Sequence, residues 1–339
     1  MNQKLKLIEK KTESQNAATL VFEKKNISYK AGQYLTLNLN LNGENVERHY
    51  SMSSHPADEH ISLTIKAINN GKVSKFMVQE SEIGQDFEFS DAGGTFVYQA
   101  KKCRNLVFWA AGSGISPILA LLKEAGIKND FEKCTLIYTF RTELDRIGAS
   151  KIEEIAQKLG DKFTLIQVLT QPSEQWVGLS GRIDDDFTIR LAEQIPIVYP
   201  QQSEHYLCGP QGFMQSVETG LQAFGVKKDS IYKESFVLSS GKIDVSVAQE
   251  AQVTAIIKGK SHEVTVKADQ TILEAFNKHK ISLPHSCQGG ICSACMVQCK
   301  EGRVLLPDDQ SALSESDIED GFVLTCVGKP GSAKIVLEY

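Results

Sequence analysis

The sequence lacks both long apolar runs and an excess of basic residues. No segment approaches the length of a membrane span, and the first four residues lead into no apolar stretch of the kind found in signal peptides. Acidic residues outnumber basic residues by 42 to 37, so the net charge is −5. Nucleic-acid binding needs a basic surface that faces the phosphates. We therefore expect a cytoplasmic protein that spans no membrane and binds no nucleic acid.

Four of the eight cysteines show no regular spacing, as expected for reduced thiols in the cytoplasm. They are Cys103, Cys134, Cys208 and Cys299. The composition, with 41% hydrophobic and 23% charged residues, is that of a soluble globular protein. At 339 residues the chain is too long for one ordinary domain and suits two or three.

The other four cysteines form a metal-binding pattern near the end of the chain. Cys287, Cys292 and Cys295 stand at C-x4-C-x2-C spacing, and Cys326 follows at a distance. This is the plant-type ferredoxin spacing, in which four thiolates hold a 2Fe–2S cluster. We therefore predict that these four cysteines are the ligands of such a cluster.

Three alternatives explain the cysteine pattern less well. Structural zinc prefers paired C-x2-C knuckles, and only one such pair is present. Disulfides are disfavoured where no secretory signal is visible. Unrelated buried cysteines would not account for Gly289 and Gly290, which permit the backbone to wrap closely around a cluster.

The first third of the sequence has the pattern of a small antiparallel β-barrel. Apolar runs or alternation occur at 19–22, 34–39 and 61–66, with turn signals between them. Two motifs stand on these strands. In Arg48-His49-Tyr50-Ser51, the arginine can neutralise a phosphate and the tyrosine can cover a flavin ring. In Gly71-Lys72-Val73-Ser74, backbone amides at a helix start can bind an anion, although each motif alone is also common on ordinary surfaces.

The middle third has the pattern of a doubly wound α/β domain. The apolar run 105–111 is typical of a parallel strand buried on both faces, and a glycine turn and an apolar helix follow it. This order suits a pyrophosphate at a helix N-terminus, but Gly112-Ser113-Gly114 lacks the third glycine of the G-x-G-x-x-G pattern. Strands at 134–140, 163–169 and 205–207 and a helix at 150–159 continue the alternation. On its residues alone, Cys208 is a buried strand-end cysteine.

In this order the motifs resemble the ferredoxin–NADP reductase superfamily, followed by a C-terminal plant-type ferredoxin domain. The resemblance rests on Arg48–Ser51, Gly71–Ser74, Gly112–Pro117, Cys208–Met214 and Glu234–Phe236. It implies a multidomain protein with an antiparallel β-barrel flavin domain, a doubly wound α/β nucleotide domain and an α+β β-grasp ferredoxin domain. We place these domains at 1–102, 103–236 and 250–339, with a linker over 237–249.

The resemblance also implies the binding residues. For FAD they are Arg48, Tyr50, Ser51, Lys66, Gly71, Lys72, Val73, Ser74, Ser116 and Phe236. For NAD(P) they are Gly112, Ser113, Gly114, Arg141, Cys208, Gly209 and Pro210. The implied catalytic residues are Ser51, Cys208 and Glu234, of which Cys208 lies beside the nicotinamide and serves hydride-transfer geometry, not covalent catalysis. A strand end that packs on the core remains an equal alternative for Phe236, and FMN remains an alternative to FAD.

The residues after the second strand of the nucleotide domain predict a preference for NADPH over NADH. An acidic residue there would bind a ribose 2′-hydroxyl and repel a 2′-phosphate. The strand is followed instead by Arg141, whose planar fork suits a phosphate. Glu143 and Asp145 are close enough in sequence to neutralise this arginine.

Taken together, the parts predict an oxidoreductase that passes electrons from NAD(P)H through FAD and a 2Fe–2S cluster to a partner protein, an oxygenase or a similar acceptor. Two alternatives stay open. One is a stand-alone ferredoxin-type electron carrier, and the other is a redox-sensing protein without useful turnover.

Overall fold

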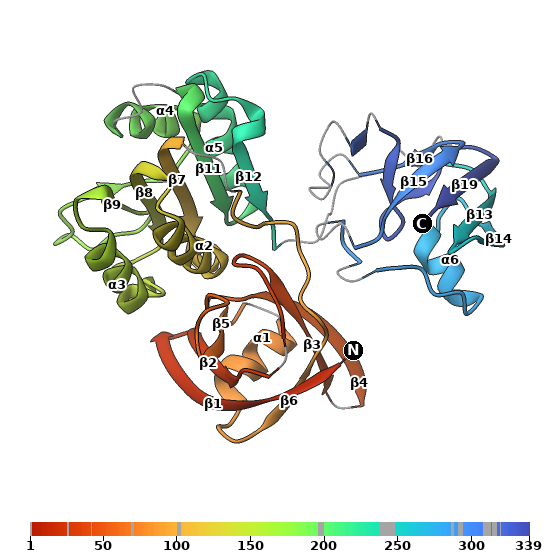
Figure 1. The fold of residues 1–339 in the computed structure, drawn as a ribbon, viewed down its shortest axis with the longest axis horizontal. Helices are drawn as coiled ribbons and strands as arrows, with labels where there is room; N and C mark the ends of the chain where they lie inside the picture. The colour runs from red at the N-terminus through yellow and green to blue at the C-terminus, as the bar shows by residue number, and fades with distance from the viewer. Residues whose placement is uncertain are drawn as a thin grey trace. The chain divides into compact units, whose positions relative to one another are not determined.

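The computed structural model describes most of the chain, and Figure 1 shows its fold. The described residues are 2–25, 27–41, 43–68, 71–99, 103–195, 200–236, 248–285, 288–290, 294–307, 313, 317–318 and 320–339. They form two compact units, Met1–Phe236 and Val237–Tyr339. No helix among these residues is both long and apolar enough to cross a membrane.

The first part of unit one is a six-stranded antiparallel β-barrel, which confirms the predicted architecture (Figure 1). Its strand order is β4-β3-β6-β1-β2-β5, and a bridge between Met52 and Leu63 joins the two edges. The strands are β1 (Gln3–Ser14), β2 (Ala17–Glu23), β3 (Tyr34–Leu41), β4 (Glu44–Ser51), β5 (His60–Lys66) and β6 (Asp86–Phe89). Apolar residues at alternate positions face the interior, where Phe22 packs edge-on against Phe87 and Phe89. The short helix α1 (Lys72–Lys75) and a π-helical turn, Phe76–Glu80, follow β5.

The second part of unit one is a parallel six-stranded sheet with helices on both faces, the predicted doubly wound fold. Its strand order is β10-β9-β8-β7-β11-β12. The strands are β7 (Cys103–Ala111), β8 (Phe131–Phe140), β9 (Phe163–Leu169), β10 (Leu179–Ser180), β11 (Ser203–Cys208) and β12 (Ile231–Glu234). The helices are α2 (Ile115–Lys128), α3 (Ala149–Leu159), α4 (Asp185–Gln194) and α5 (Gln211–Ala223), with five short 3-10 turns at Gly112–Gly114, Glu143–Asp145, Gly160–Lys162, Pro200–Gln202 and Lys228–Ser230.

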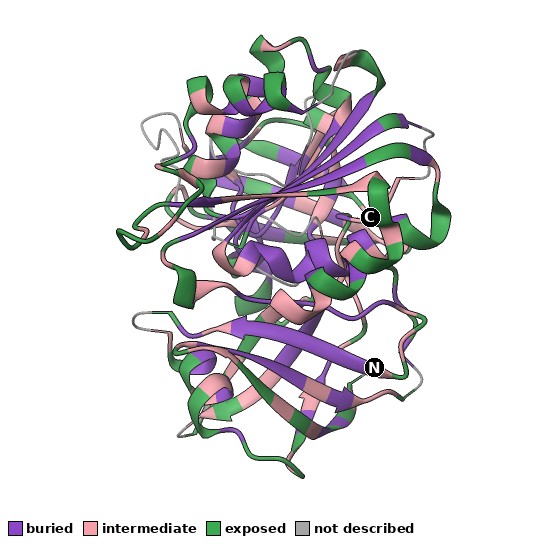
Figure 2. Ribbon diagram, turned by 90° about the vertical axis from the view of Figure 1, so that its left-hand side faces the viewer, coloured by how far each residue is buried: buried purple, intermediate pink, exposed green. Residues whose placement is uncertain are grey.

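Both faces of this sheet are buried, as the continuous apolar run of β7 predicts. Phe108 packs in the core beneath α2 and α3, whereas Val107 and Trp109 pack in the core beneath α4 and α5. Figure 2 shows the buried residues concentrated in these strands. Because parallel strands end at the same edge, the carboxyl ends of β7, β8 and β11 bring the predicted nucleotide residues to one side of the sheet.

Unit two has a five-stranded mixed sheet in the order β14-β13-β19-β15-β17 and a two-stranded ribbon of β16 and β18. Its strands are β13 (Ala251–Ile257), β14 (Lys260–Val266), β15 (Met296–Glu301), β16 (Val304–Leu305), β17 (Phe322–Leu324), β18 (Lys329–Pro330) and β19 (Lys334–Glu338). The helix α6 (Ile272–Lys278) begins at a capping box of Thr271 and Glu274, in which each side chain accepts a hydrogen bond from the other residue's backbone N–H. Ile272 and Phe276 bury this helix against the sheet, as in a β-grasp domain.

Candidate flavin, nucleotide and iron–sulfur sites

A cavity of about 480 Å³ lies between the barrel and the start of α2, a size typical of small-molecule sites. It is lined by β4, β5, the α1 turn, the first turns of the nucleotide domain and the end of unit one. All ten residues predicted to hold FAD line it: Arg48, Tyr50, Ser51, Lys66, Gly71, Lys72, Val73, Ser74, Ser116 and Phe236. No sequence motif singles out five other lining residues, Val46, His49, Thr64, Ile65 and Ile68, and the last one, Ser113, belongs to the predicted nucleotide residues.

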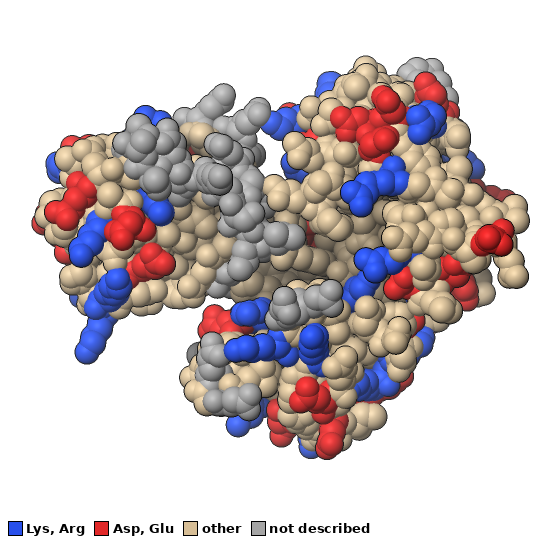
Figure 3. Space-filling model, turned by 180° about the vertical axis from the view of Figure 1, so that it is seen from behind, with Lys and Arg blue, Asp and Glu red and all other residues tan. Residues whose placement is uncertain are grey.

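The polar and apolar parts of this lining fit a flavin with phosphate groups. Arg48, Lys66 and Lys72 provide three cationic side chains, and Figure 3 shows Lys and Arg side chains gathered on the barrel. Phe236 is 42% exposed, so it is not the core residue that the alternative interpretation required. Burial raises the pKa of Tyr50, which keeps its phenol protonated.

The turn before α1 requires glycine for steric reasons. A Cβ atom on Gly71 would lie 2.4 Å from Ser74 Oγ and 2.5 Å from Ile68 Cγ1. Ser74 Oγ donates to the Gly71 carbonyl at 3.2 Å and accepts from the Ile68 N–H at 3.3 Å. The serine therefore holds the turn closed at the edge of the flavin cavity.

Ser51, the last residue of β4, joins the barrel to the nucleotide domain. Its hydroxyl donates to Glu234 Oε2 at 2.8 Å, and its carbonyl accepts from Ser116 Oγ at 3.0 Å. Glu234 ends β12 and is half-buried as a whole residue, but the burial of its carboxyl raises the pKa to about 8, although the Ser51 bond acts in the opposite direction. Two predicted catalytic residues, Ser51 and Glu234, are thus in direct contact.

The glycine turn after β7 packs directly on the turn after β11. Gly112 has a φ of +53°, which favours glycine. A Cβ atom on Gly114 would lie 2.1 Å from the Cys208 carbonyl oxygen and 2.8 Å from Gly209 N, so only glycine fits there. A Cβ atom on Gly209 would lie 2.7 Å from Ala111 Cβ. The structure therefore brings together Gly112–Gly114 and Cys208–Pro210, two separate sequence motifs that are both predicted to bind the nucleotide.

The Cys208 thiol lies in the middle of this arrangement. Cys208 pairs in register with Ala110 on one side and Glu234 on the other, and it is fully buried. Burial raises the pKa of the thiol well above its ordinary value. A thiol that stays protonated is a poor nucleophile, which is compatible with the predicted packing role.

Arg141 follows β8 at the same edge of the sheet and is exposed. Within the described residues its side chain has no hydrogen bond or ion pair. The two carboxylates that could neutralise it have other partners. Glu143 accepts from Ser173 N at 3.1 Å and from Ser173 Oγ at 2.7 Å, and Asp145 accepts from Thr142 N and Oγ1 at 3.1 and 2.8 Å. The contact between Glu143 and Ser173 could not be predicted from the sequence, because it joins two loops that are 30 residues apart.

Two of the four predicted cluster ligands lie within the described residues, and Cys287 and Cys292 lie outside them. Cys295 and Cys326 are buried, with their sulfur atoms 3.1 Å apart. Two thiols this close can ligate one iron of a 2Fe–2S cluster. Among the three described residues 288–290, Gly290 has the positive φ expected for a wrapping loop, and Gln288 also has a positive φ, whereas Gly289 does not. Cys299, which is not among the predicted ligands, lies on β15 and donates to backbone carbonyls.

Three family models match the chain in the predicted order. They are an oxidoreductase FAD-binding domain at residues 4–98, an oxidoreductase NAD-binding domain at 108–219 and a 2Fe–2S iron–sulfur cluster binding domain at 255–331. The protein is thus a flavin- and iron–sulfur-dependent oxidoreductase that uses a nicotinamide nucleotide.

Curated relatives narrow this class. The chain is 30% identical over 326 residues to the ferredoxin reductase component of 3-ketosteroid-9-alpha-monooxygenase from Mycolicibacterium smegmatis, covering 92% of this chain and 88% of the relative. It is 28% identical over 339 residues to a subunit of 1,2-phenylacetyl-CoA epoxidase from Escherichia coli, covering 97% and 95%. The chain belongs to this family of three-domain ferredoxin reductase components.

Solved structures share the fold. Phthalate dioxygenase reductase matches with a TM-score of 0.59 and 19% identity over 100% of this chain and 98% of that one. An intact type IV self-sufficient cytochrome P450 monooxygenase matches with a TM-score of 0.77 and 18% identity, and this chain spans 41% of its length. The match to FAD- and NAD-binding domains argues against a stand-alone ferredoxin-type carrier.

Proposed function

We propose that this protein is the reductase component of an oxygenase system and delivers electrons from NADPH to an oxygenase such as a phenylacetyl-CoA epoxygenase. The observation that carries the proposal is the flavin cavity, which adjoins the packed turns of Gly112–Gly114 and Cys208–Pro210. The similarity to the phenylacetyl-CoA epoxidase subunit of Escherichia coli along 97% of the chain supports this kind of acceptor.

The residues have distinct tasks in this proposal. FAD bound here would supply a hydride acceptor, and a 2Fe–2S cluster would supply single-electron transfer. Arg48 and Lys72 neutralise the flavin phosphates, and the Gly71–Ser74 turn supplies backbone donors. Gly114 lets the predicted nucleotide turn approach Cys208 closely, and the protonated thiol would pack beside a bound nicotinamide. Glu234 holds a proton at neutral pH and keeps Ser51 in place.

The acceptor is tested with the loaded protein and a purified phenylacetyl-CoA epoxygenase. NADPH and the wild-type reductase should support substrate epoxidation, whereas Cys326→Ser should abolish it and still reduce ferricyanide, an acceptor that takes electrons from the flavin. Cys299→Ser, outside the ligand set, should behave as wild type. Epoxygenase turnover that is no faster with the reductase than without it would contradict the proposed acceptor.

The preference for NADPH rests on Arg141, whose neighbouring carboxylates are engaged elsewhere. Arg141→Ala should lower kcat/KM for NADPH about ten- to a hundredfold and leave kcat/KM for NADH nearly unchanged. Arg104→Ala is a matched control, because Arg104 pairs with Glu132 near the opposite end of the sheet. A wild-type preference for NADH, or equal losses with both nucleotides, would refute the assignment.

We also place the protein in the cytoplasm. Its scattered cysteines Cys103, Cys134, Cys208 and Cys299 are free thiols, as expected for a reducing compartment. Cell fractionation followed by immunoblotting tests this location, and recovery in a secreted fraction would contradict it.

A further inference from the structure

A second cavity, of about 200 Å³, lies outside the flavin site, and its long walls are two helices. From α2 it is lined by Leu119, Leu122, Lys123, Gly126 and Ile127, and from α3 by Lys151, Glu154, Ile155, Lys158 and Leu159. Both sets have the i, i+3, i+4, i+7, i+8 spacing of a single helix face. Ser53 and Asp58, from the barrel loop after β4, complete the lining. We call this space the α2–α3 groove.

Lys123, Lys151 and Asp58 lie at one end of the groove, and the other end is mainly apolar apart from the exposed Lys158. Lys151, in the first turn of α3, reaches Ser53 at the barrel end. At the other end Leu159 lies near Gly126, and Ile127 is 57% exposed at the mouth. The groove is therefore amphipathic along its length.

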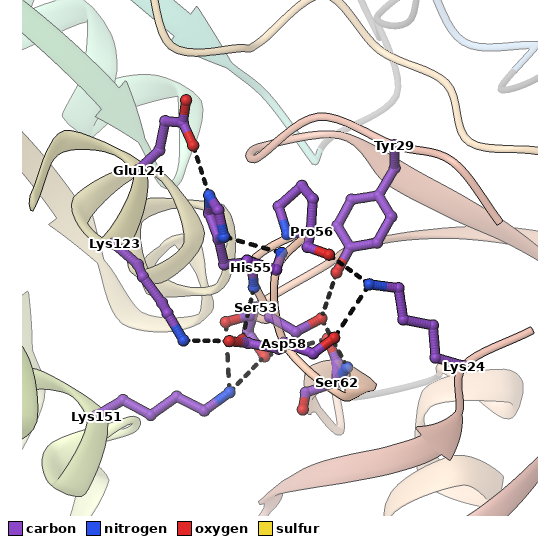
Figure 4. Close-up of polar contacts among 12 residues, drawn as sticks. Lys24, Tyr29, Ser53, His55, Pro56, Asp58, Ser62, Lys123, Glu124 and Lys151 are labelled. Carbon is purple, nitrogen blue, oxygen red and sulfur yellow. Dashed lines mark hydrogen bonds and ion pairs between the residues drawn. The ribbon is translucent and has the colours of Figure 1, made fainter. Parts of the chain in front are cut away.

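Figure 4 shows how the charges at the barrel end are distributed. Asp58 is already neutralised, because its carboxylate accepts from Lys123 Nζ and from the backbone N–H of His55. The pKa of Asp58 is accordingly lowered even though burial opposes this, so the carboxylate stays charged. The five charged residues that line the groove, Lys123, Lys151, Lys158, Asp58 and Glu154, have a net charge of +1.

Lys151 forms no ion pair with a carboxylate among the described residues, although Asp58, Glu13 and Glu154 lie near enough to raise its pKa. Its ammonium donates only to the Ser53 carbonyl at 3.3 Å and to Ser53 Oγ at 3.4 Å, and no ion pair of Lys151 exists among the described residues. Ser53 Oγ is already bonded to Thr64 Oγ1 at 2.7 Å and to the Ser62 carbonyl at 3.3 Å. Burial lowers the pKa of Lys151. This half-buried ammonium has two long contacts to neutral oxygens, and the carboxylates around it act on it only from a distance, so it lacks the direct ion pair that such a group normally has.

We propose that the α2–α3 groove binds a small amphipathic monocarboxylate, whose carboxylate pairs with Lys151 and whose hydrocarbon part lies between Leu122, Ile155 and Leu159. The volume is about that of seven water molecules, which limits the ligand to a short aliphatic or a single-ring acid. This site is separate from the flavin cavity and does not depend on the proposed acceptor.

Binding at this position stabilises the contact between the two parts of unit one. The barrel contributes Ser53 and Asp58, and the nucleotide domain contributes α2 and α3. The same contact already contains the hydrogen bond between His55 Nε2 and Glu124 Oε2. A ligand that binds only the assembled groove raises the unfolding temperature by mass action.

The test uses the full, flavin-loaded chain with sodium hexanoate as the probe, measured by calorimetric titration and thermal unfolding. Wild type should bind hexanoate and melt at a higher temperature with it. Three control compounds should not bind. Hexan-1-ol lacks the anionic head group, hexylammonium reverses its charge, and inorganic phosphate lacks the hydrocarbon tail. Lys151→Met should weaken hexanoate binding about tenfold or more. Lys133→Met, which removes an exposed lysine elsewhere in the same domain, should bind as wild type.

A second variant keeps the test decisive if Lys151→Met folds poorly. A Cβ atom on Gly126 makes only an ordinary 3.5 Å contact with Leu159, so Gly126→Met places its side chain in the groove and replaces a mid-helix glycine with a better helix former. It should fold at least as well as wild type and lose hexanoate binding. Wild type that binds no hexanoate at tens of millimolar, phosphate that binds as well as hexanoate, or hexanoate binding that survives Gly126→Met would each overturn the proposal.

Discussion

The contact of Gly114 with the Cys208–Gly209 turn makes a strong quantitative prediction. Gly114 has a φ of −60°, so alanine is compatible with its backbone conformation, and any effect of Gly114→Ala must come from the added methyl group. That methyl would lie 2.1 Å from the Cys208 carbonyl oxygen and 2.8 Å from Gly209 N. Both are backbone atoms at the end of β11, which is paired on both sides in the sheet, so they cannot turn away as a side chain could.

The size of the effect follows from this rigidity. Overpacking a well-packed site costs about 1–3 kcal/mol, and a backbone clash this close belongs at the upper end. For a unit of this size, about 3 kcal/mol corresponds to a fall in Tm of roughly 6–12 °C. The predicted nucleotide turn must also move away from Cys208, so KM for NADPH should rise severalfold.

Thermal unfolding and steady-state kinetics of the loaded protein measure both effects, and Gly212→Ala is the matched control. Gly212 lies in the first turn of α5, where an added Cβ meets no atom within 4 Å, so alanine should be neutral or slightly stabilising. If the Tm of Gly114→Ala is within about 2 °C of wild type and its KM for NADPH is unchanged, the predicted steric clash is wrong.

Three further outcomes are expected. Because the pKa of Glu234 in the folded state is raised to about 8, its contribution to stability is complete below pH 4.5 and is lost as the pH rises to 8. The free energies of unfolding of wild type and Glu234→Gln, measured by denaturant titration, should therefore diverge over this window by up to about 5 kcal/mol. Parallel pH profiles would contradict the assigned pKa. Arg48→Ala should weaken FAD binding about tenfold through the loss of a charge-assisted phosphate contact, measured by flavin release on ultrafiltration, and unchanged retention would remove Arg48 from the site. Cys326→Ser should lose iron and acid-labile sulfide, and Cys299→Ser should keep both; zinc in place of iron in anaerobically prepared wild type would refute the cluster.

The strand and helix patterns of the sequence were sufficient to predict the architecture. Apolar and polar residues alternate along a barrel strand because only one face of the strand is buried. The apolar run of β7 is continuous because both faces of that strand are buried. Most of the residues predicted to bind FAD belong to the local motifs Arg48–Ser51 and Gly71–Ser74, and the cavity brings these two motifs together.

Contacts between distant parts of the chain were not predictable in the same way. Ser51 and Glu234 are 183 residues apart, and nothing in either motif indicates that one hydroxyl bonds to the other's carboxyl. Gly114 must be glycine because it lies close to the Cys208 carbonyl oxygen, and this contact exists only because β7 and β11 are neighbours in the sheet. The bond from Ser173 to Glu143 and the α2–α3 groove likewise depend on loop and helix positions that no local pattern specifies.

Helix α2 contributes to both cavities of unit one. Ser116 in its first turn lines the flavin cavity and bonds to Ser51, and Lys123, about 10 Å further along the axis, lines the groove. A packed helix moves as a rigid body, so a ligand in either cavity affects the position of the same helix, α2. Thermodynamic reciprocity then applies: the factor by which hexanoate changes the affinity for FAD equals the factor by which FAD changes the affinity for hexanoate. Titration of hexanoate into flavin-loaded and flavin-free protein therefore measures the coupling between the two cavities without any catalytic turnover.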